Sequence, residues 1–210
     1  DVIVLSEIYE DLLKRVAADS AGYAGEFYTQ RHIIRAMVEV VQPQPGERVY
    51  DPCFGTAGFL GEAADYMRHH NTLSAAQLDD LQHSIFYGRE LKPLTYLLGS
   101  MNMILHGIEG ANLELANTLE FHEQNVGEKN RYDVVLANPP YVPSGDSHLS
   151  RGGLPFEPLE ALAAGPEGLD AIAAIGQKVV VGDKYRIFAI SECLFGFISV
   201  VVDVSATVEI

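Results

Sequence analysis

Residues 133–141 read DVVLANPPY, and this stretch decides how the rest of the chain is interpreted. An acid followed by four apolar residues predicts a strand that is buried in a parallel sheet. The strand must stop at residues 138–141, because neither proline has an N–H to donate to a neighbouring strand. Pro139 also disfavours the helical region for Asn138, so the turn is stiff. Its amide, two proline carbonyls and aromatic ring would recognise a planar, amino-bearing group at the carboxyl end of a strand, where open α/β sheets bind ligands.

The composition predicts a globular, acidic protein. Hydrophobic residues make up 48% and charged residues 20% of 210 residues, and the mean hydropathy is near zero, which excludes a disordered chain. With 29 acidic and 14 basic residues, the formal net charge is -15. This charge disfavours tight non-specific binding to nucleic acid by the chain alone, because that affinity comes mainly from neutralising phosphates. A nucleic-acid substrate would need a local basic patch or a more basic partner.

Cysteine usage and hydropathy predict a cytoplasmic protein. Cys53 and Cys193 form no motif, which is typical of a reduced compartment, and no signal-peptide pattern is present. The most apolar run, residues 187–202, is shorter than the ~18–20 residues of a membrane span and contains Glu192. We therefore expect no membrane association. The chain begins at Asp1 and ends in an apolar run, so we expect a fragment of a longer protein.

Helical and strand patterns alternate along the first 141 residues. Strands are expected at residues 47–51, 85–89, 111–115 and 133–137, and helices at 3–18, 30–41, from the glycine loop to about 68, 74–82 and 93–106. Thr29 is expected to cap the helix that starts at Gln30. This alternation predicts an α/β fold with a doubly wound, mostly parallel sheet and a short N-terminal helical segment.

The pattern is weaker after Tyr141. We expect a loop over residues 144–158, a helix over 159–174 and a strand over 178–181, while 185–204 fits one or two buried strands or a buried helix. The expected organisation is the end of an N-terminal helical region at residues 1–24, a core at 25–145, and a tail at 146–210 that completes or caps the sheet.

The ends of the predicted strands carry polar side chains that fit a nucleoside. The loop at residues 51–58 has neither the G-x-G-x-x-G pattern of dinucleotide sites nor a phosphate-binding G-K-[ST], and Asp51 suits a cationic ligand. Glu90 could accept hydrogen bonds from ribose hydroxyls, or be a surface acid. Asn117 could contact an adenine edge, or form an ordinary Asx turn. Together they fit S-adenosylmethionine, which has a positive amino group and sulfonium, a ribose and an adenine.

The histidines do not predict a metal site. None has metal-ligand spacing with another, so we interpret them as surface or helix-end residues. They are His32, His69, His70, His83, His106, His122 and His148.

The chain resembles the adenine-specific (N6) DNA methyltransferase family, and most closely the modification subunits of type I restriction–modification systems. The resemblance runs from about residue 22 to residue 141 and rests on an ordered set of motifs. They are GEFYTQR (25–31), DPCFGTAGF (51–59), YGRE (87–90), LLGSMNMILHG (97–107), NTL (117–119) and NPPY (138–141).

This resemblance implies a Rossmann-like methyltransferase core that moves a methyl group from S-adenosyl-L-methionine to the N6 amino group of adenine. It implies double-stranded DNA with a flipped adenine as substrate, and a specificity subunit and a restriction subunit as partners. The implied catalytic residues are Asn138, Pro139, Pro140 and Tyr141. The implied donor-binding residues are Glu26, Phe27, Tyr28, Thr29, Gln30, Arg31, Asp51, Thr56, Ala57, Gly58, Phe59, Glu90 and Asn117.

Two alternatives stay open at this point. The NPPY turn is also found in enzymes that methylate glutamine in proteins or bases in RNA. The family's usual pattern is not seen after about residue 143, so an inactive, truncated remnant is the other alternative. Gln30, Phe54, Ala57 and Tyr141 also depart from the residues most common in the family.

Overall fold

A computed structural model of the chain describes Tyr9 and residues 29–120, 131–150, 163–178, 181–193 and 196–204. The helix expected at residues 3–18, apart from Tyr9, lies outside the described residues, as do Glu26, Phe27 and Tyr28. None of the helices within these ranges is long and apolar enough to cross a membrane.

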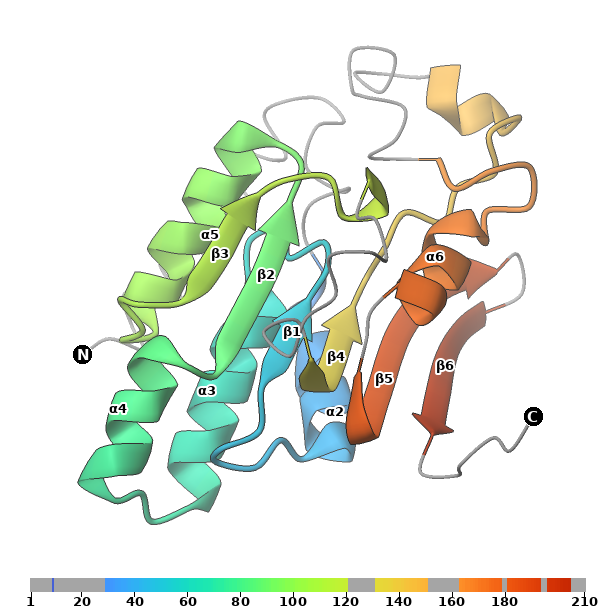
Figure 1. The fold of residues 1–210 in the computed structure, drawn as a ribbon. Coiled ribbons are helices and arrows are strands. Elements are labelled where there is room, and N and C mark those ends of the chain that lie inside the picture. The colour runs from blue at the N-terminus through green and yellow to red at the C-terminus, as the bar shows by residue number, and fades with distance from the viewer. Residues whose placement is uncertain are drawn as a thin grey trace.

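The described residues form a six-stranded sheet with helices on both faces (Figure 1). The strand order is β3-β2-β1-β4-β5-β6, in which the first five strands are parallel and β6 is antiparallel to β5. The strands are β1 (Val49–Asp51), β2 (Phe86–Glu90), β3 (Asn112–Leu115), β4 (Tyr132–Ala137), β5 (Val181–Cys193) and β6 (Gly196–Val204). The predicted doubly wound, mostly parallel α/β fold is confirmed.

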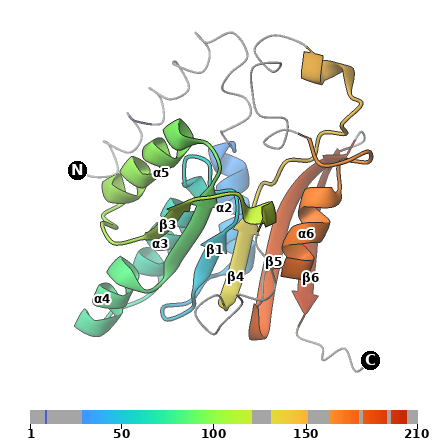
Figure 2. The same cartoon turned by 45° about the horizontal axis from the view of Figure 1, so that its top comes forward.

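The helices divide between the two faces of the sheet. α6 packs on one face and α2 and α3 on the other (Figures 1 and 2). The helices are α2 (Arg31–Val41), α3 (Gly58–His70), α4 (Ala75–His83), α5 (Pro93–Leu105) and α6 (Asp170–Lys178), with short 3-10 turns at Thr118–Glu120 and Ser147–Ser150. The expected helices and strands between residues 30 and 137 agree with these bounds to within about two residues.

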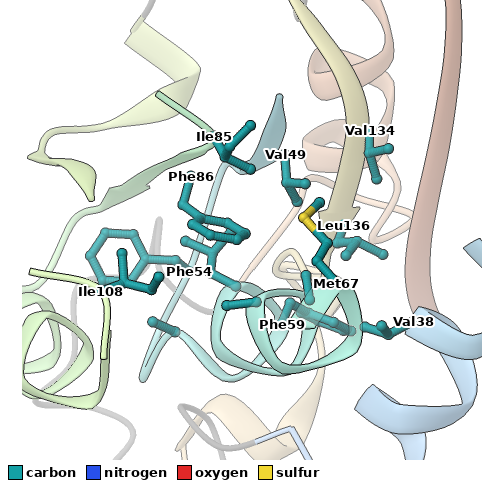
Figure 3. Packing of buried hydrophobic residues seen from close by; sticks show 14 of the residues in the cluster. Val38, Val49, Phe54, Phe59, Met67, Ile85, Phe86, Ile108, Val134 and Leu136 are labelled. Atoms are coloured by element: carbon teal, nitrogen blue, oxygen red, sulfur yellow. The ribbon is translucent and has the colours of Figure 1, made fainter. Parts of the chain in front are cut away.

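The larger core lies between α2, α3 and the first strands. The apolar residues of α2 that are buried, Ile34, Met37, Val38 and Val41, recur at helical spacing, which is why this segment forms a helix with one face on the sheet. Figure 3 shows Val38 and the α3 residues Phe59 and Met67 beside Val49, Val134 and Leu136 of the strands.

Two expectations at helix starts are wrong. Gln30, not Thr29, is the N-cap of α2, and its side chain makes no capping hydrogen bond. The helix expected over 159–174 instead begins at Asp170 and runs to Lys178, so it includes part of the stretch expected as a strand. Gly165 and Gly168 both have φ of +76°, a left-handed conformation that forms a turn and not a helix. Residues 159–162 lie outside the described part.

The open alternative for residues 185–204 is resolved in favour of two strands. β5 pairs with β4 in parallel, with Leu136 opposite Phe188, and β6 folds back beside β5. A hydrophobic run of this length has no periodicity that separates strands from a buried helix, whereas pairing with an existing sheet edge satisfies its backbone groups.

Candidate active site

A cavity of about 240 Å³ opens where the strands β1 to β4 end. β1 pairs with β2 on one side and β4 on the other. The chain runs outwards from β1 through β2 to β3 and then returns to β4, so the strand order reverses its direction between β1 and β4. Such a topological switch point is where open α/β sheets bind ligands. Predicted site residues on the cavity wall are Thr29, Asp51, Thr56, Gly58, Phe59, Glu90, Asn117, Asn138, Pro139, Pro140 and Tyr141.

Three other predicted residues do not line this cavity. Ala57 is fully buried and is the N-cap of α3, where its φ of +59° turns the backbone from the loop into the helix. Gln30 is exposed at the start of α2. The Arg31 side chain reaches Glu62, with 3.9 Å between Nε and Oε2.

Glu90 holds the glycine loop against the end of β2. Its Oε2 accepts a hydrogen bond from the Gly55 N–H at 3.0 Å, and its Oε1 accepts one from the Lys92 N–H at 2.8 Å. Burial raises the pKa of Glu90, while these two N–H groups and the Lys92 charge act in the opposite direction. A carboxylate oxygen has more than one lone pair, so both oxygens can still accept hydrogen bonds from a ligand.

Asp51 is the most buried carboxyl group of the cavity. It is 1% exposed, and its Oδ1 accepts a hydrogen bond from the Cys53 N–H at 3.1 Å. Burial raises the pKa of Asp51 to about 8, and the negative charge of Glu90 also raises it. Two buried acids at one end of the cavity favour a ligand that brings positive charge and hydroxyl donors.

The end of β3 adds a polar turn to the wall. The Oδ1 of Asn117 accepts a hydrogen bond from the Leu119 N–H at 3.0 Å, which makes the Asx turn that was the simpler alternative for this residue. The Thr118 hydroxyl donates to the Pro52 carbonyl and ties this turn to the loop after β1. Asn117 therefore has a structural role and also lines the cavity.

Asn138 provides an acceptor that the described residues leave unsatisfied. Its Nδ2 donates to the Thr29 hydroxyl at 3.1 Å, while its buried Oδ1 has no hydrogen-bond partner in the described part of the chain. Leaving a buried acceptor unpaired costs about 1–3 kcal/mol. Such an atom on a cavity wall is explained when a ligand supplies the donor. The residues therefore fit a ligand with an N–H group at Asn138 and a cationic nucleoside at Asp51 and Glu90.

Several wall residues were missed from the sequence. Cys53 was not among the predicted site residues, yet it lines the cavity, and burial raises the pKa of its thiol well above the ordinary value. Its place in the loop between β1 and α3 could have indicated this. Ala171 and Ile175 of α6 also line the cavity. They come from the tail, where no sequence signal connects them to the other loops.

The sequence of the chain is similar to those of methylase subunits of type I restriction enzymes. The chain is 35% identical over 158 residues to the methylase subunit of the type I restriction enzyme EcoKI from Escherichia coli K12, which covers 69% of this chain and 28% of the relative. It is 40% identical over 139 residues to the EcoEI methylase subunit from Escherichia coli, covering 66% and 27%. The chain thus spans a little over a quarter of the length of these relatives.

Solved structures give the same result. A chain of a type I restriction–modification system aligns with a TM-score of 0.70 and 36% identity, covering 90% of this chain and 37% of the other. The EcoKI M protein aligns with a TM-score of 0.60 and 28% identity, covering 78% of this chain and 33% of the other.

Residues 2–152 match the family described as N-6 DNA Methylase. The chain therefore belongs to the N-6 DNA methylase family.

Proposed function

We propose that this chain carries the catalytic core of an enzyme that moves a methyl group from S-adenosyl-L-methionine to the N6 amino group of adenine in DNA. The observation that carries the proposal is the unpaired, buried Oδ1 of Asn138 on the wall of a cavity that also contains Asp51 and Glu90. Membership of the N-6 DNA methylase family supports it.

In this proposal the carboxyl groups bind the methyl donor. Glu90, already held by two backbone N–H groups, accepts hydrogen bonds from the ribose hydroxyls. Asp51 lies beside the positive charge of the donor, and Asn117 beside its adenine. Thr56, Gly58 and Phe59 line the same wall. The family resemblance adds residues 26–31 to the proposed donor site, and of these Thr29 lies on the cavity wall. When bound, the donor supplies an electrophilic methyl group.

The turn at the end of β4 acts on the target amine. An exocyclic amine conjugated to a purine is a poor nucleophile, because its lone pair is delocalised into the ring. Asn138 Oδ1 and the Pro139 carbonyl accept hydrogen bonds from its two N–H groups and draw them out of the ring plane, so that the lone pair becomes available for an in-line attack on the methyl carbon. The bond from that carbon to the sulfonium sulfur breaks as the C–N bond forms, and the methylated nitrogen then loses one proton to solvent. Tyr141 stacks on the flipped base and offsets part of the few kcal/mol that extrusion costs.

The charge of the chain argues for partners. With a formal net charge of -15, the chain has no sequence-wide electrostatic attraction for DNA. We propose that a specificity subunit reads the DNA sequence and that a restriction subunit completes the assembly in the cytoplasm. Within the chain, residues 1–24 end a helical region, 25–145 form the catalytic core, and 146–210 complete or cap the sheet.

The test is the Asn138→Ala protein, assembled with its specificity partner. We expect S-adenosylmethionine binding by calorimetry to be retained and transfer of radiolabelled methyl to unmethylated genomic DNA to be lost. Asn71→Ala, the same change at the C-terminus of α3, should leave transfer intact, because this side chain donates to the Met67 carbonyl at 3.1 Å and does not line the cavity. Unchanged transfer in Asn138→Ala would contradict the role of Asn138.

Parallel assays separate the other candidate functions. A buried amide acceptor serves the amide of a glutamine side chain as well as a base amine, so protein and RNA substrates are assayed beside DNA. Transfer to either, with none to DNA, would replace the proposed substrate. Absence of S-adenosylmethionine binding in the wild-type assembly would favour an inactive remnant.

A further inference from the structure

The Thr29 hydroxyl contacts a residue 109 positions away in the chain. It accepts the hydrogen bond from Asn138 Nδ2 at 3.1 Å, although Thr29 lies one residue before the N-cap of α2 and its residue type is favoured for capping helices. Both residues line the cavity. The hydroxyl is therefore directed at the turn that ends β4, where it bonds the amide that faces the target amine in the proposed function.

The orientation of this amide decides what the target amine meets. An asparagine side chain has one accepting end and one donating end, and rotation by 180° about its last bond exchanges them. With Nδ2 on Thr29, the accepting Oδ1 is the end left for the amine. In the reverse orientation the Thr29 hydroxyl would donate to Oδ1, the amide N–H groups would face those of the amine, and neither hydrogen of the amine would have an acceptor at Asn138.

We infer that Thr29 is a positioning residue that holds the Asn138 amide with its oxygen towards the target amine. This inference rests on the proposed function and changes the role of Thr29 within it, because the family resemblance implies donor binding for this residue. The step itself transfers no proton to Thr29. In the orientation that the structure shows, the hydroxyl accepts a hydrogen bond from the amide and anchors it. The second catalytic contact, the Pro139 carbonyl, needs no such anchor because a carbonyl can only accept.

Thr29→Val tests the inference, because valine keeps the shape and removes the hydroxyl. In the full chain assembled with its specificity partner, we expect kcat for methyl transfer to unmethylated DNA to fall ~10- to 100-fold, as for a misoriented catalytic group. The KM for S-adenosylmethionine should stay within about twofold. Thr29→Ser keeps the hydroxyl and should restore most of kcat. A raised donor KM with unchanged kcat would overturn the inference and return Thr29 to the donor site.

The Asn138→Asp background gives a sharper control. An aspartate has two equivalent oxygens, so it presents an acceptor to the amine in either orientation. We expect Thr29→Val to reduce kcat much less in Asn138→Asp than in the wild type, which a double-mutant cycle measures. Equal reductions in the two backgrounds would mean that Thr29 supports the fold near the cavity, and would overturn the inference.

A measurement without turnover separates this inference from the proposed function. In asparagine-labelled protein, the side-chain NH2 signals of Asn138 are those missing from Asn138→Asp. Their hydrogen exchange should quicken in Thr29→Val and not in Thr29→Ser. If the wild type transfers no methyl group yet shows this pattern, the proposed function fails while the Thr29–Asn138 link stands. Unchanged exchange in Thr29→Val would overturn the link itself.

Discussion

Gly99 in α5 packs directly against the ring of Phe54 from the loop after β1. A Cβ atom at residue 99 would lie 2.5 Å from the ring carbon Cε2 and 2.7 Å from the Gly55 carbonyl oxygen. On the β2 side, a Cβ at Gly88 would lie 2.7 Å from ring carbon Cδ1. Two glycines from different elements thus give the ring its space, which explains how this chain accommodates a large side chain within its glycine loop.

Gly99→Ala is therefore expected to destabilise the protein by about 1–3 kcal/mol, the usual range for overpacking a core. Chemical denaturation measures this. Gly145→Ala is the matched control, because nothing lies within 4 Å of a Cβ there and its φ is not positive. Phe54→Leu should recover part of the loss in the double mutant. If Gly99→Ala and Gly145→Ala unfold at the same denaturant concentration, the predicted clash does not occur.

Asp51 makes the stability of the protein depend on pH. Its pKa is raised in the folded state from 3.8 to about 8, so between these values the folded protein holds a proton that the unfolded chain has lost. The contribution of Asp51 to the free energy of unfolding is therefore largest at low pH and falls as the pH rises from about 4 to about 8. Asp51→Asn removes this titration, and its Oδ1 can still accept the Cys53 N–H.

We expect the stability advantage of Asp51→Asn over the wild type to grow from pH 4 to pH 8, by on the order of 1–5 kcal/mol. Denaturation at several pH values without donor measures it. Asp80→Asn, on the exposed surface of α4, controls for the loss of one negative charge. A difference between Asp51→Asn and wild type that does not change with pH would contradict the raised pKa.

The sequence predicted α2 to α5 and β1 to β4 because each contains a complete local pattern. In α2, the apolar positions Ile34, Met37, Val38 and Val41 already define one buried face. In β4, the prolines at 139 and 140 mark the end of the strand. That the polar residues at the strand ends would lie around one cavity was predictable for the same reason, since parallel strands bring their carboxyl ends to one edge.

Contacts between distant segments could not be predicted this way. The turn before α6 contains Gly168, where a Cβ would lie 2.2 Å from the Tyr141 carbonyl oxygen, so the backbone of the tail lies against the turn at residues 138–141. A helical pattern over 159–174 carries no sign of that approach. The Thr29–Asn138 hydrogen bond is likewise set by how α2 and β4 pack, and not by the local sequence of either.

Proton release on donor binding follows from the position of Asp51. A positive charge bound beside this carboxyl group would lower its pKa from about 8, so binding near pH 7 should release a proton, up to one per site. Calorimetry in two buffers with different ionisation enthalpies counts the protons. The affinity for S-adenosylmethionine should rise between pH 6 and pH 8, and Asp51→Asn should abolish both effects. Equal proton release in wild type and Asp51→Asn would exclude Asp51 as the contact of the cation.

Glu90→Gln should weaken donor binding and loosen the glycine loop together. The two backbone N–H groups of Gly55 and Lys92 each need an acceptor, and a glutamine offers one oxygen and one NH2 group, so one N–H would face another donor. We expect a loss of about 1–3 kcal/mol in stability, as for an unpaired buried donor, and at least a tenfold weaker S-adenosylmethionine affinity by calorimetry.

Glu114→Gln is the control and should change donor affinity little. Glu114 lies in the neighbouring strand, is largely exposed, and pairs with Arg89 at 2.8 Å. If Glu90→Gln lowers stability but leaves donor affinity unchanged, Glu90 supports the loop and does not bind the ribose.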